Sequence, residues 1–402
     1  MREKKLFLLH DLPYPDIDGG KKLSLGRIIE ASKYFDVIVL AFNYKAIDYT
    51  EAELFFISKN ISFYCYTPRK KATGFFKLIQ YLSFLLSEYP TYYNILSAKL
   101  FSDFISMILK KTKPNRISIE TIYLASHIKE FTNIVDEIEI VFHNVESLFF
   151  VELSKSTSKV HMRIAYLIES RKINNLEKII SKKINTINSL FPVCLSRNDS
   201  DYYKNNFNFN KIRINTNKIY LKNIVNHNPD FKNPYFLFPG SLEFPPNKEA
   251  ILWFLDEYIK HFKEPLDIII TGNYTKLTKK KFQKYKFLKL TGFISNEELM
   301  KYYENCICVI SPIISGGGIK IKNIEAISLS IPILMTKFSV IGIEYKDNKL
   351  IKISENLPDE FSNNLITFYK EIKNANFASG KNIYIFLYSS ISNHCNLYDV
   401  HW

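Results

Sequence analysis

The apolar residues in the first half of the chain occur in short runs that alternate with longer stretches of helical spacing. After the first run, Leu25, Ile28 and Ile29 recur at intervals typical of the buried face of a helix. The strands that the apolar runs predict are residues 6–9, 36–42, 61–66, 117–119, 138–142 and 190–195. Because strands separated by helices pair in parallel through crossover connections, this half is predicted to be a doubly wound α/β domain.

The same alternation returns in the second half, after a stretch that lacks it. Residues 197–234 are rich in Asn, Lys, Tyr and Phe, and we expect them to connect two domains. Beyond them the patterns predict strands at 235–238, 267–271, 288–291, 307–311, 333–336 and 350–353, and helices at 247–260, 296–304, 319–330 and 357–373. The predicted fold class is α/β, with two Rossmann-like doubly wound domains facing a central cleft, where the carboxyl ends of the strands would hold a ligand.

The predicted domain boundaries follow this rhythm. Residues 1–196 form an N-terminal Rossmann-like domain, residues 197–234 the connection, and residues 235–373 a C-terminal Rossmann-like domain. Residues 374–402 are a tail that could return to the N-terminal domain. The length of 402 residues agrees with two domains, since single domains usually have about 100–200 residues.

The composition is ordinary for a globular protein, with 47% hydrophobic and 23% charged residues. No apolar run approaches the ~18 residues needed to span a bilayer, and the apolar start of the chain is too short for a signal peptide. The five cysteines lack the spacing of a zinc site, and four of them lie in strand-like contexts, so disulfides are not expected. We therefore expect a cytoplasmic protein.

The charge is strongly positive, with 54 Lys and Arg against 40 acidic residues and a net charge of +14. Such a balance indicates either attraction to an anionic partner or simply lysine-rich residue usage. No nucleic-acid-binding motif is present, so nucleic acid is not a predicted partner. In residues 69–86 a basic cluster enters an apolar helix, which suits either contact with an anionic membrane surface or burial against the sheet.

A strand followed by a glycine loop and a helix is the most informative motif. It spans residues 311–326, with three glycines at 316–318 between the predicted strand and helix. Glycines permit close approach of the backbone to a ligand, and the free N–H groups of a helix start attract phosphate. Lys320 and Lys322 could add positive charge there, and Glu325 could accept hydrogen bonds from the hydroxyls of a ribose.

This motif resembles the donor-binding signature of family-4 glycosyltransferases, which have the GT-B fold and act with retention. In that family three glycines are followed, in order, by an Arg or Lys, a second lysine and a Glu-Ala pair. Four further segments resemble family motifs in the same order along the chain: residues 12–20, 142–147, 238–254 and 291–294. The resemblance thus covers most of the chain.

The resemblance implies a site for a nucleotide-sugar donor, with a UDP-sugar as the expected substrate and no cofactor. His143, at a predicted strand end, would be the catalytic-site residue near the transferred sugar. The glycines at 19–20 would approach the diphosphate, those at 316–318 would contact diphosphate or sugar, and Gly240 with Ser241 would line the cleft. The loop at 293–294 would hold the base, and Glu325 the ribose. The implied donor-binding residues are Gly19, Gly20, Gly240, Ser241, Phe293, Ile294, Gly316, Gly317, Gly318, Lys320, Lys322 and Glu325.

The resemblance also implies the other partner and the setting. The N-terminal domain would take a glycan or lipid-linked acceptor and the C-terminal domain the donor, in a hexosyltransferase-like reaction. Relatives of this type commonly build surface polysaccharides or glycoconjugates, so the protein is expected in the cytoplasm, with peripheral contact to the inner face of the cell membrane.

The sequence departs from the family at two places. Gly317 stands where many members carry a glutamate. Many members also use an Arg and a Lys near the start of the second domain to neutralise the diphosphate, and here that stretch contains only Lys248. No Asp-x-Asp metal motif follows a predicted strand, so transfer is expected to be metal-independent. The alternatives are a nucleotide-sugar 2-epimerase of the same fold and a non-catalytic nucleotide-sugar-binding subunit.

Overall fold

The computed structural model describes residues 2–68, 83, 86–157, 159–215, 219–221, 225–343, 345 and 348–379. It divides into two compact units, one formed by residues 1–220 with 317–319 and the other by residues 221–316 and 320–402. Almost all of the predicted membrane segment, residues 69–86, and most of the predicted tail, residues 374–402, lie outside the described residues. No described helix is long and apolar enough to cross a membrane.

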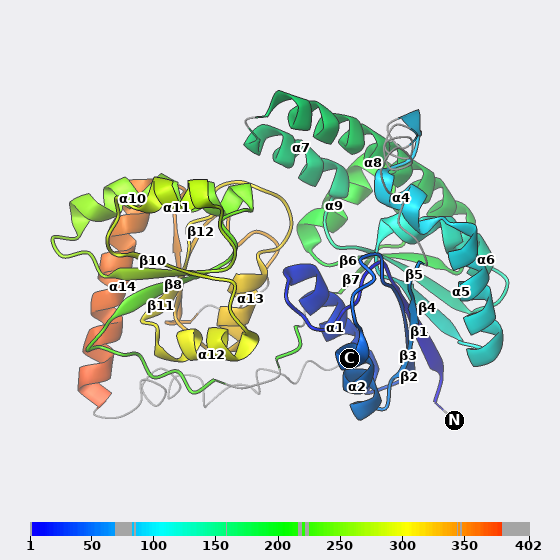
Figure 1. Ribbon diagram of the computed structural model, residues 1–402, viewed down its shortest axis with the longest axis horizontal. Coiled ribbons are helices and arrows are strands. Elements are labelled where there is room, and N and C mark those ends of the chain that lie inside the picture. The colour runs from blue at the N-terminus through cyan, green and yellow to red at the C-terminus, as the bar shows by residue number, and fades with distance from the viewer. Residues whose placement is uncertain are drawn as a thin grey trace. The chain divides into compact units, whose positions relative to one another are not determined.

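The first unit is built on a parallel sheet with the strand order β3-β2-β1-β4-β5-β6-β7 (Figure 1). The strands are β1 (Lys4–Leu9), β2 (Asp36–Phe42), β3 (Ser62–Tyr66), β4 (Arg116–Ile119), β5 (Glu137–Phe142), β6 (Leu190–Cys194) and β7 (Arg213–Ile214). The helical elements are α1 (Gly19–Ala31), α2 (Thr50–Ser58), α4 (Thr91–Leu96), α5 (Lys99–Thr112), η1 (Ile122–His127), α6 (Ile128–Phe131), α7 (Glu146–Ser156), α8 (Val160–Thr186) and α9 (Arg197–Phe207).

Both faces of this sheet are covered, which explains the near-continuous apolar runs of its strands. Along β1, Leu6 and Leu8 enter one core cluster, whereas Phe7 and Leu9 enter another. Successive side chains of a strand point to opposite faces, so the two clusters lie on the two sides of the sheet. The first predicted doubly wound domain is thereby confirmed.

The first unit extends beyond residue 196, the predicted boundary. Residues 197–207 form α9, which buries Ser200, Tyr203 and Phe207, and β7 adds an edge strand to the sheet. The predicted connection was therefore too long at its start. Its Asn- and Lys-rich composition belongs to the solvent face of α9, whose buried face is narrow and aromatic.

The second unit has the parallel strand order β10-β9-β8-β11-β12-β13. The strands are β8 (Tyr235–Pro239), β9 (Asp267–Thr271), β10 (Leu288–Gly292), β11 (Cys308–Ser311), β12 (Ile333–Thr336) and β13 (Ile351–Ser354). The helices are α10 (Pro245–His261), α11 (Lys276–Phe282), α12 (Asn296–Asn305), α13 (Ile321–Ser328) and α14 (Pro358–Ser379). Core clusters again line both faces, so the second doubly wound domain is confirmed as well.

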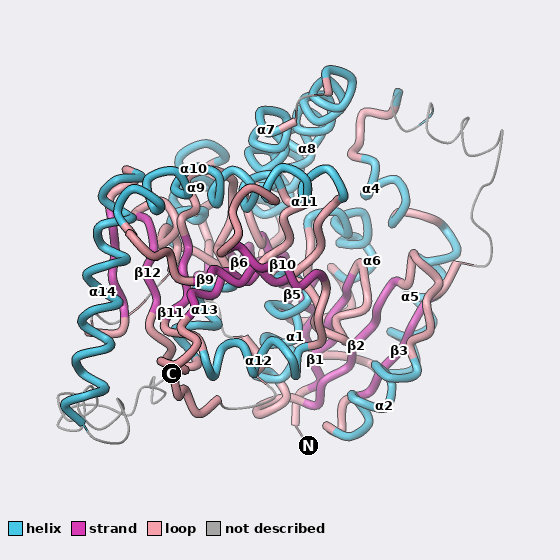
Figure 2. Tube along the Cα trace, turned by 60° about the vertical axis from the view of Figure 1, so that its left-hand side comes forward, coloured by secondary structure: helices cyan, strands magenta, loops and turns pink. Residues whose placement is uncertain are grey.

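In each sheet there is one strand from which successive strands are added first on one side and then on the other. In the second unit, β8 has β9 on one side and β11 on the other; in the first, β1 lies between β2 and β4. In open α/β sheets, ligands bind outside the carboxyl ends of the strands at this switch point. The loops that follow β8 and β11, and those that follow β1 and β4, are therefore the places to examine. Figure 2 shows the strands of both sheets in magenta.

Candidate functional site

The two loops at the switch point of the second unit contain the glycines that the sequence motifs singled out. Gly240 follows β8 with φ +152°, and Gly316, with φ +93°, lies in the loop after β11. A Cβ on Gly240 would lie 2.8 Å from Nδ2 of Asn247 and 3.1 Å from Nζ of Lys322. A Cβ on Gly316 would lie 2.9 Å from Cγ of Pro246. The positive φ values favour glycine at both positions, and at position 316 the ring of Pro246 also leaves little room for a Cβ.

Lys322 is the main charged side chain of this cluster, and it is not solvated as lysines usually are. From the first turn of α13 its Nζ donates to Oδ1 of Asn247 at 2.9 Å and lies 3.7 Å from the ring centroid of Phe238. Burial lowers the pKa of Lys322 well below its ordinary value, with a further lowering by the charge of Lys320, while Glu325 acts in the opposite direction. An anion placed here would restore the charged form.

The amide of Asn247 fixes this arrangement, because it connects the loop after β8 with the start of α13. It accepts from Lys322 and donates to the backbone carbonyl of Ser241 at 2.9 Å. The hydroxyl of Ser241 in turn donates to the carbonyl of Asn273 at 3.0 Å. The structure thus brings together Gly240, Ser241 and Lys322 from the predicted donor-binding set, and it adds Asn247, whose role the sequence did not indicate.

Glu325 lies farther along α13 and is only 5% exposed. The hydroxyl of Tyr303, itself fully buried, donates to Oε2 of Glu325 at 3.4 Å. Lys320 is the N-cap residue of α13, and its Nζ lies 4.9 Å from the ring centroid of Phe338.

Four further residues of the predicted donor-binding set lie in the loop after β11 or directly after β10. Gly317 and Gly318 continue the loop after β11, and Gly318 has φ +69°. Phe293 and Ile294 follow β10, and Phe293 is 62% exposed. In the sheet order β10 is two strands from β8, and the parallel strands end on the same side of the sheet. The exposed ring after β10 is therefore available to a ligand that extends from the switch point.

Gly19 and Gly20 begin α1 in the first unit, but the start of this helix already holds a negative group. The carboxylate of Asp18 caps it and accepts from the backbone N–H of Lys21 at 3.0 Å. A Cβ on Gly20 would meet only Oδ1 of Asp18, at 3.5 Å. Packing does not require glycine at position 20, which leaves close approach of a ligand as the reason that the resemblance offers.

His143 follows β5 and lies beside a buried carboxylate that sequence reasoning missed. Its Nε2 is 3.8 Å from Oε2 of Glu120, which directly follows β4 at the switch point. Among the described residues, neither ring nitrogen of His143 has a hydrogen-bond partner, although both are buried. An acidic residue directly after a buried strand is the signal that could have identified Glu120.

Glu120 is held in its ionised form by a network within the first unit. Nε of Arg27 lies 3.3 and 3.2 Å from its two carboxylate oxygens, and Ser118 donates to Oε1 at 2.7 Å. Burial alone would raise the pKa of Glu120, but Arg27 and the neighbouring His143 lower it to about 2. The carboxylate therefore presents a fixed negative charge to His143 at neutral pH.

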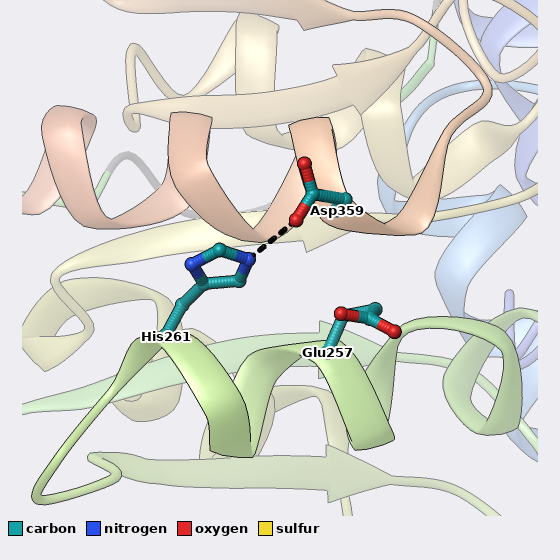
Figure 3. A group of neighbouring side chains, drawn as sticks. All are labelled: Glu257, His261 and Asp359. Atoms are coloured by element: carbon teal, nitrogen blue, oxygen red, sulfur yellow. Dashed lines mark hydrogen bonds and ion pairs between the residues drawn. The ribbon is translucent and has the colours of Figure 1, made fainter.

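A separate group of possible metal ligands lies on the surface of the second unit (Figure 3). Glu257, His261 and Asp359 place ligand atoms within 4.8 Å of one another. Nε2 of His261, at the end of α10, is 2.6 Å from Oδ1 of Asp359 in the first turn of α14, and Glu257 is paired with Lys260 at 2.6 Å. The His261–Asp359 and Glu257–Lys260 pairs account for these side chains without a metal.

Comparison with known proteins agrees with the glycine-loop geometry. A family model described as Glycosyl transferases group 1 matches residues 233–371. The match runs through the second unit from β8 into α14. A protein of Klebsiella pneumoniae, named "Uncharacterized 44.6 kDa protein in cps region", is 30% identical over 155 residues, which cover 36% of this chain and 39% of that protein. The aligned part thus spans well under half of this relative.

Solved structures resemble the chain over nearly its whole length. Anabaena Alr3699/HepE in complex with UDP and glucose has a TM-score of 0.57 at 13% identity, with 97% of this chain and 98% of the other covered. WaaG, a glycosyltransferase involved in lipopolysaccharide biosynthesis, has a TM-score of 0.54 at 12% identity, with 97% and 98% covered. The predicted fold class, two parallel-sheet α/β domains of the GT-B type, is confirmed.

Proposed function

We propose that the protein is a glycosyltransferase that takes a sugar from a nucleotide-sugar donor, with a UDP-sugar as the donor. The observation that carries the proposal is the cluster of Lys322, Asn247 and Gly240 at the switch point, inside the domain that matches the group 1 family. The cluster joins a buried amine to a glycine loop and a helix start, which together suit a diphosphate. HepE, similar in fold, was solved with UDP and glucose.

The chemistry asks the protein to stabilise a departing nucleoside diphosphate while the anomeric carbon becomes cation-like. Lys322 and Lys320, with the N–H groups of the loop after β11, would supply positive charge where the leaving group forms. This is the basis for proposing metal-independent transfer. Retention of anomeric configuration rests on the resemblance to family-4 enzymes.

The finer assignments follow the same logic. Glu325 would accept from the ribose, and Phe293 with Ile294 would hold the base. Gly19, Gly20 and His143 of the first unit would act toward the sugar, as the resemblance implies. His143 would then be fixed by the charge of Glu120, and its unpartnered nitrogens would suit hydrogen bonds to sugar hydroxyls.

The acceptor is proposed to be a glycan or a lipid-linked glycan, in the assembly of a surface polysaccharide or glycoconjugate. WaaG, whose fold is similar, is involved in lipopolysaccharide biosynthesis, and the Klebsiella relative is named for a cps region. A hexose is the proposed transferred sugar, and the cytoplasmic side of a membrane the proposed place of work.

A panel of nucleotide sugars in a thermal-unfolding assay tests the donor assignment. A donor that binds only the folded protein stabilises it by about 2.7 kcal/mol at a concentration one hundred times Kd. We expect a shift with UDP and with at least one UDP-sugar, and a smaller one with uridine. No shift with any nucleotide would contradict the proposal.

One observation favours a second candidate, a non-catalytic nucleotide-sugar-binding subunit. Gly317 stands where many members of the family that the sequence resembles carry a glutamate, so that acidic group is missing. Binding of a UDP-sugar without release of UDP, either to water or to an acceptor, would support this candidate.

A further inference from the structure

The outward face of helix α8 combines exposed apolar and basic side chains. In its first turns Val160 is 71% exposed, Ile164 53%, Leu167 44% and Ile168 41%. Farther along the helix Arg171, Lys178 and Lys182 are exposed. At 100° per residue these positions fall within an arc of about 100°, so they form one continuous face. We call these seven residues the α8 outer face.

The opposite face of α8 is firmly packed, which fixes the direction of the outer face. Ile173, Leu176, Ile180 and Ile184 are buried in the core of the first unit. Near the start of the helix, Tyr166 makes an edge contact with Phe150 of α7, at 6.0 Å between ring centroids. Figures 1 and 2 both show α7 and α8 side by side. The exposed apolar residues therefore do not belong to the core.

The two carboxylates of α8 both lie away from the outer face. Glu169 accepts from the backbone N–H of Thr91 at 2.6 Å, at the start of α4. Glu177 is buried and accepts from the hydroxyls of Ser147 and Tyr203 at 2.7 and 2.8 Å. The outer face thus carries positive charge and apolar surface, and no acidic side chain.

We propose that the α8 outer face binds the surface of an anionic lipid bilayer. Exposed apolar side chains next to cationic ones fit a surface that has negative headgroups above an apolar layer. A second copy of the chain fits less well. Parallel pairing of two α8 outer faces would oppose like charges, and antiparallel pairing would set apolar residues against lysines.

This inference does not rest on the proposed glycosyltransferase activity. It also differs from the membrane contact predicted for residues 69–86, because it uses a helix of the described chain. Over the 23 residues from 160 to 182 the face would extend about 33 Å along the surface.

Co-sedimentation of the full chain with vesicles tests the inference. We expect binding to vesicles of phosphatidylglycerol and phosphatidylcholine, weak binding to phosphatidylcholine alone, and release at high salt. The triple variant Arg171→Gln, Lys178→Gln and Lys182→Gln should lower the affinity on the order of 100-fold, because each basic residue near an anionic surface contributes roughly a factor of five. The variant Ile164→Ser with Leu167→Ser should also weaken binding.

Matched controls separate the α8 outer face from general charge and hydrophobicity. Lys279, Lys280 and Lys281 of α11 are exposed lysines of the second unit, and their change to Gln removes the same charge. Leu54 and Leu277, exposed by 62% and 81%, serve for the apolar pair when changed to Ser. Both control variants should bind vesicles as the unaltered protein does.

Three results would overturn the inference. These are absence of vesicle binding at low salt, equal losses in the α8 and control variants, or a dimer in light scattering that Ile164→Ser with Leu167→Ser dissociates. The last result would assign the face to a second copy. Far-UV circular dichroism of each variant checks that α8 is retained, and because these residues are exposed, folding should be unchanged.

Discussion

Replacement of Lys322 by Met should weaken donor binding without weakening the fold. Met has a similar length and is apolar, so it can occupy the space beside Phe238 and Asn247. The change removes a partly buried amine whose charged form is disfavoured, and it also removes the hydrogen bond to Asn247, so the two effects on the fold oppose each other. Thermal unfolding of Lys322→Met should therefore change little.

The expected loss in UDP affinity follows from the usual strength of a hydrogen bond to a charged group. A hydrogen bond to a charged group contributes about 1.5–3 kcal/mol, which corresponds to a roughly 10- to 150-fold weaker binding of UDP in calorimetry. Uridine lacks the diphosphate, so its binding should change much less. The double change of Lys320 and Lys322 should widen that difference. Equal losses for UDP and uridine would refute the assignment of these lysines to the diphosphate.

The buried state of Lys322 also predicts a proton uptake. Burial lowers its pKa in the free protein, and a bound diphosphate raises it again because it favours the charged form. Between the two pKa values the complex holds more protons than the free protein, so UDP affinity should fall as pH rises through this window. Calorimetry in buffers of different ionisation enthalpy should show proton uptake with UDP, and none in Lys322→Met. Uptake that persists in this variant would contradict the argument.

Three further predictions concern other parts of the chain. Glu325→Gln should weaken donor binding by about 1.5–3 kcal/mol in calorimetry, and unchanged affinity would remove Glu325 from the site. Glu120→Gln should destabilise the first unit by about 1.5–3 kcal/mol in urea unfolding, because the buried Arg27 would lose the charge of Glu120 and keep that of Glu139, 3.5 Å from its Nη2; a loss below about 1 kcal/mol would argue against the network. Neutralising the four basic residues of 69–86 should weaken vesicle binding if that predicted segment also contacts lipid, and intact binding would leave the α8 outer face as the contact.

The sheets could be predicted from the sequence because parallel strands buried on both faces leave nearly continuous apolar runs. β7 was not predicted, since it pairs over only Arg213 and Ile214, and α9 was taken for a connection because its exposed polar residues outnumber its buried ones. The order of glycine motifs indicated the loops at the second switch point. The predicted cleft and the individual donor-binding roles stay predictions.

Burial and distant pairing were beyond the reach of the sequence patterns. A lysine after a glycine loop is usually solvated, and the burial of Lys322 depends on Phe238 and Asn247, which are far away along the chain. The same holds for Glu120, which is paired with Arg27 across 93 residues. Such contacts depend on the spatial order of the strands in the sheet, which short sequence motifs do not indicate.

Proton NMR of the purified protein, incubated with UDP-sugars that stabilise it, tests the central claim most directly. The account predicts release of UDP together with a sugar or glycoside whose anomeric configuration is that of the donor when first formed, and a strong reduction of this release in Lys322→Met. Donors that bind and remain intact with every acceptor would contradict transferase activity and indicate a binding subunit, and a released sugar inverted at C2 would identify an epimerase.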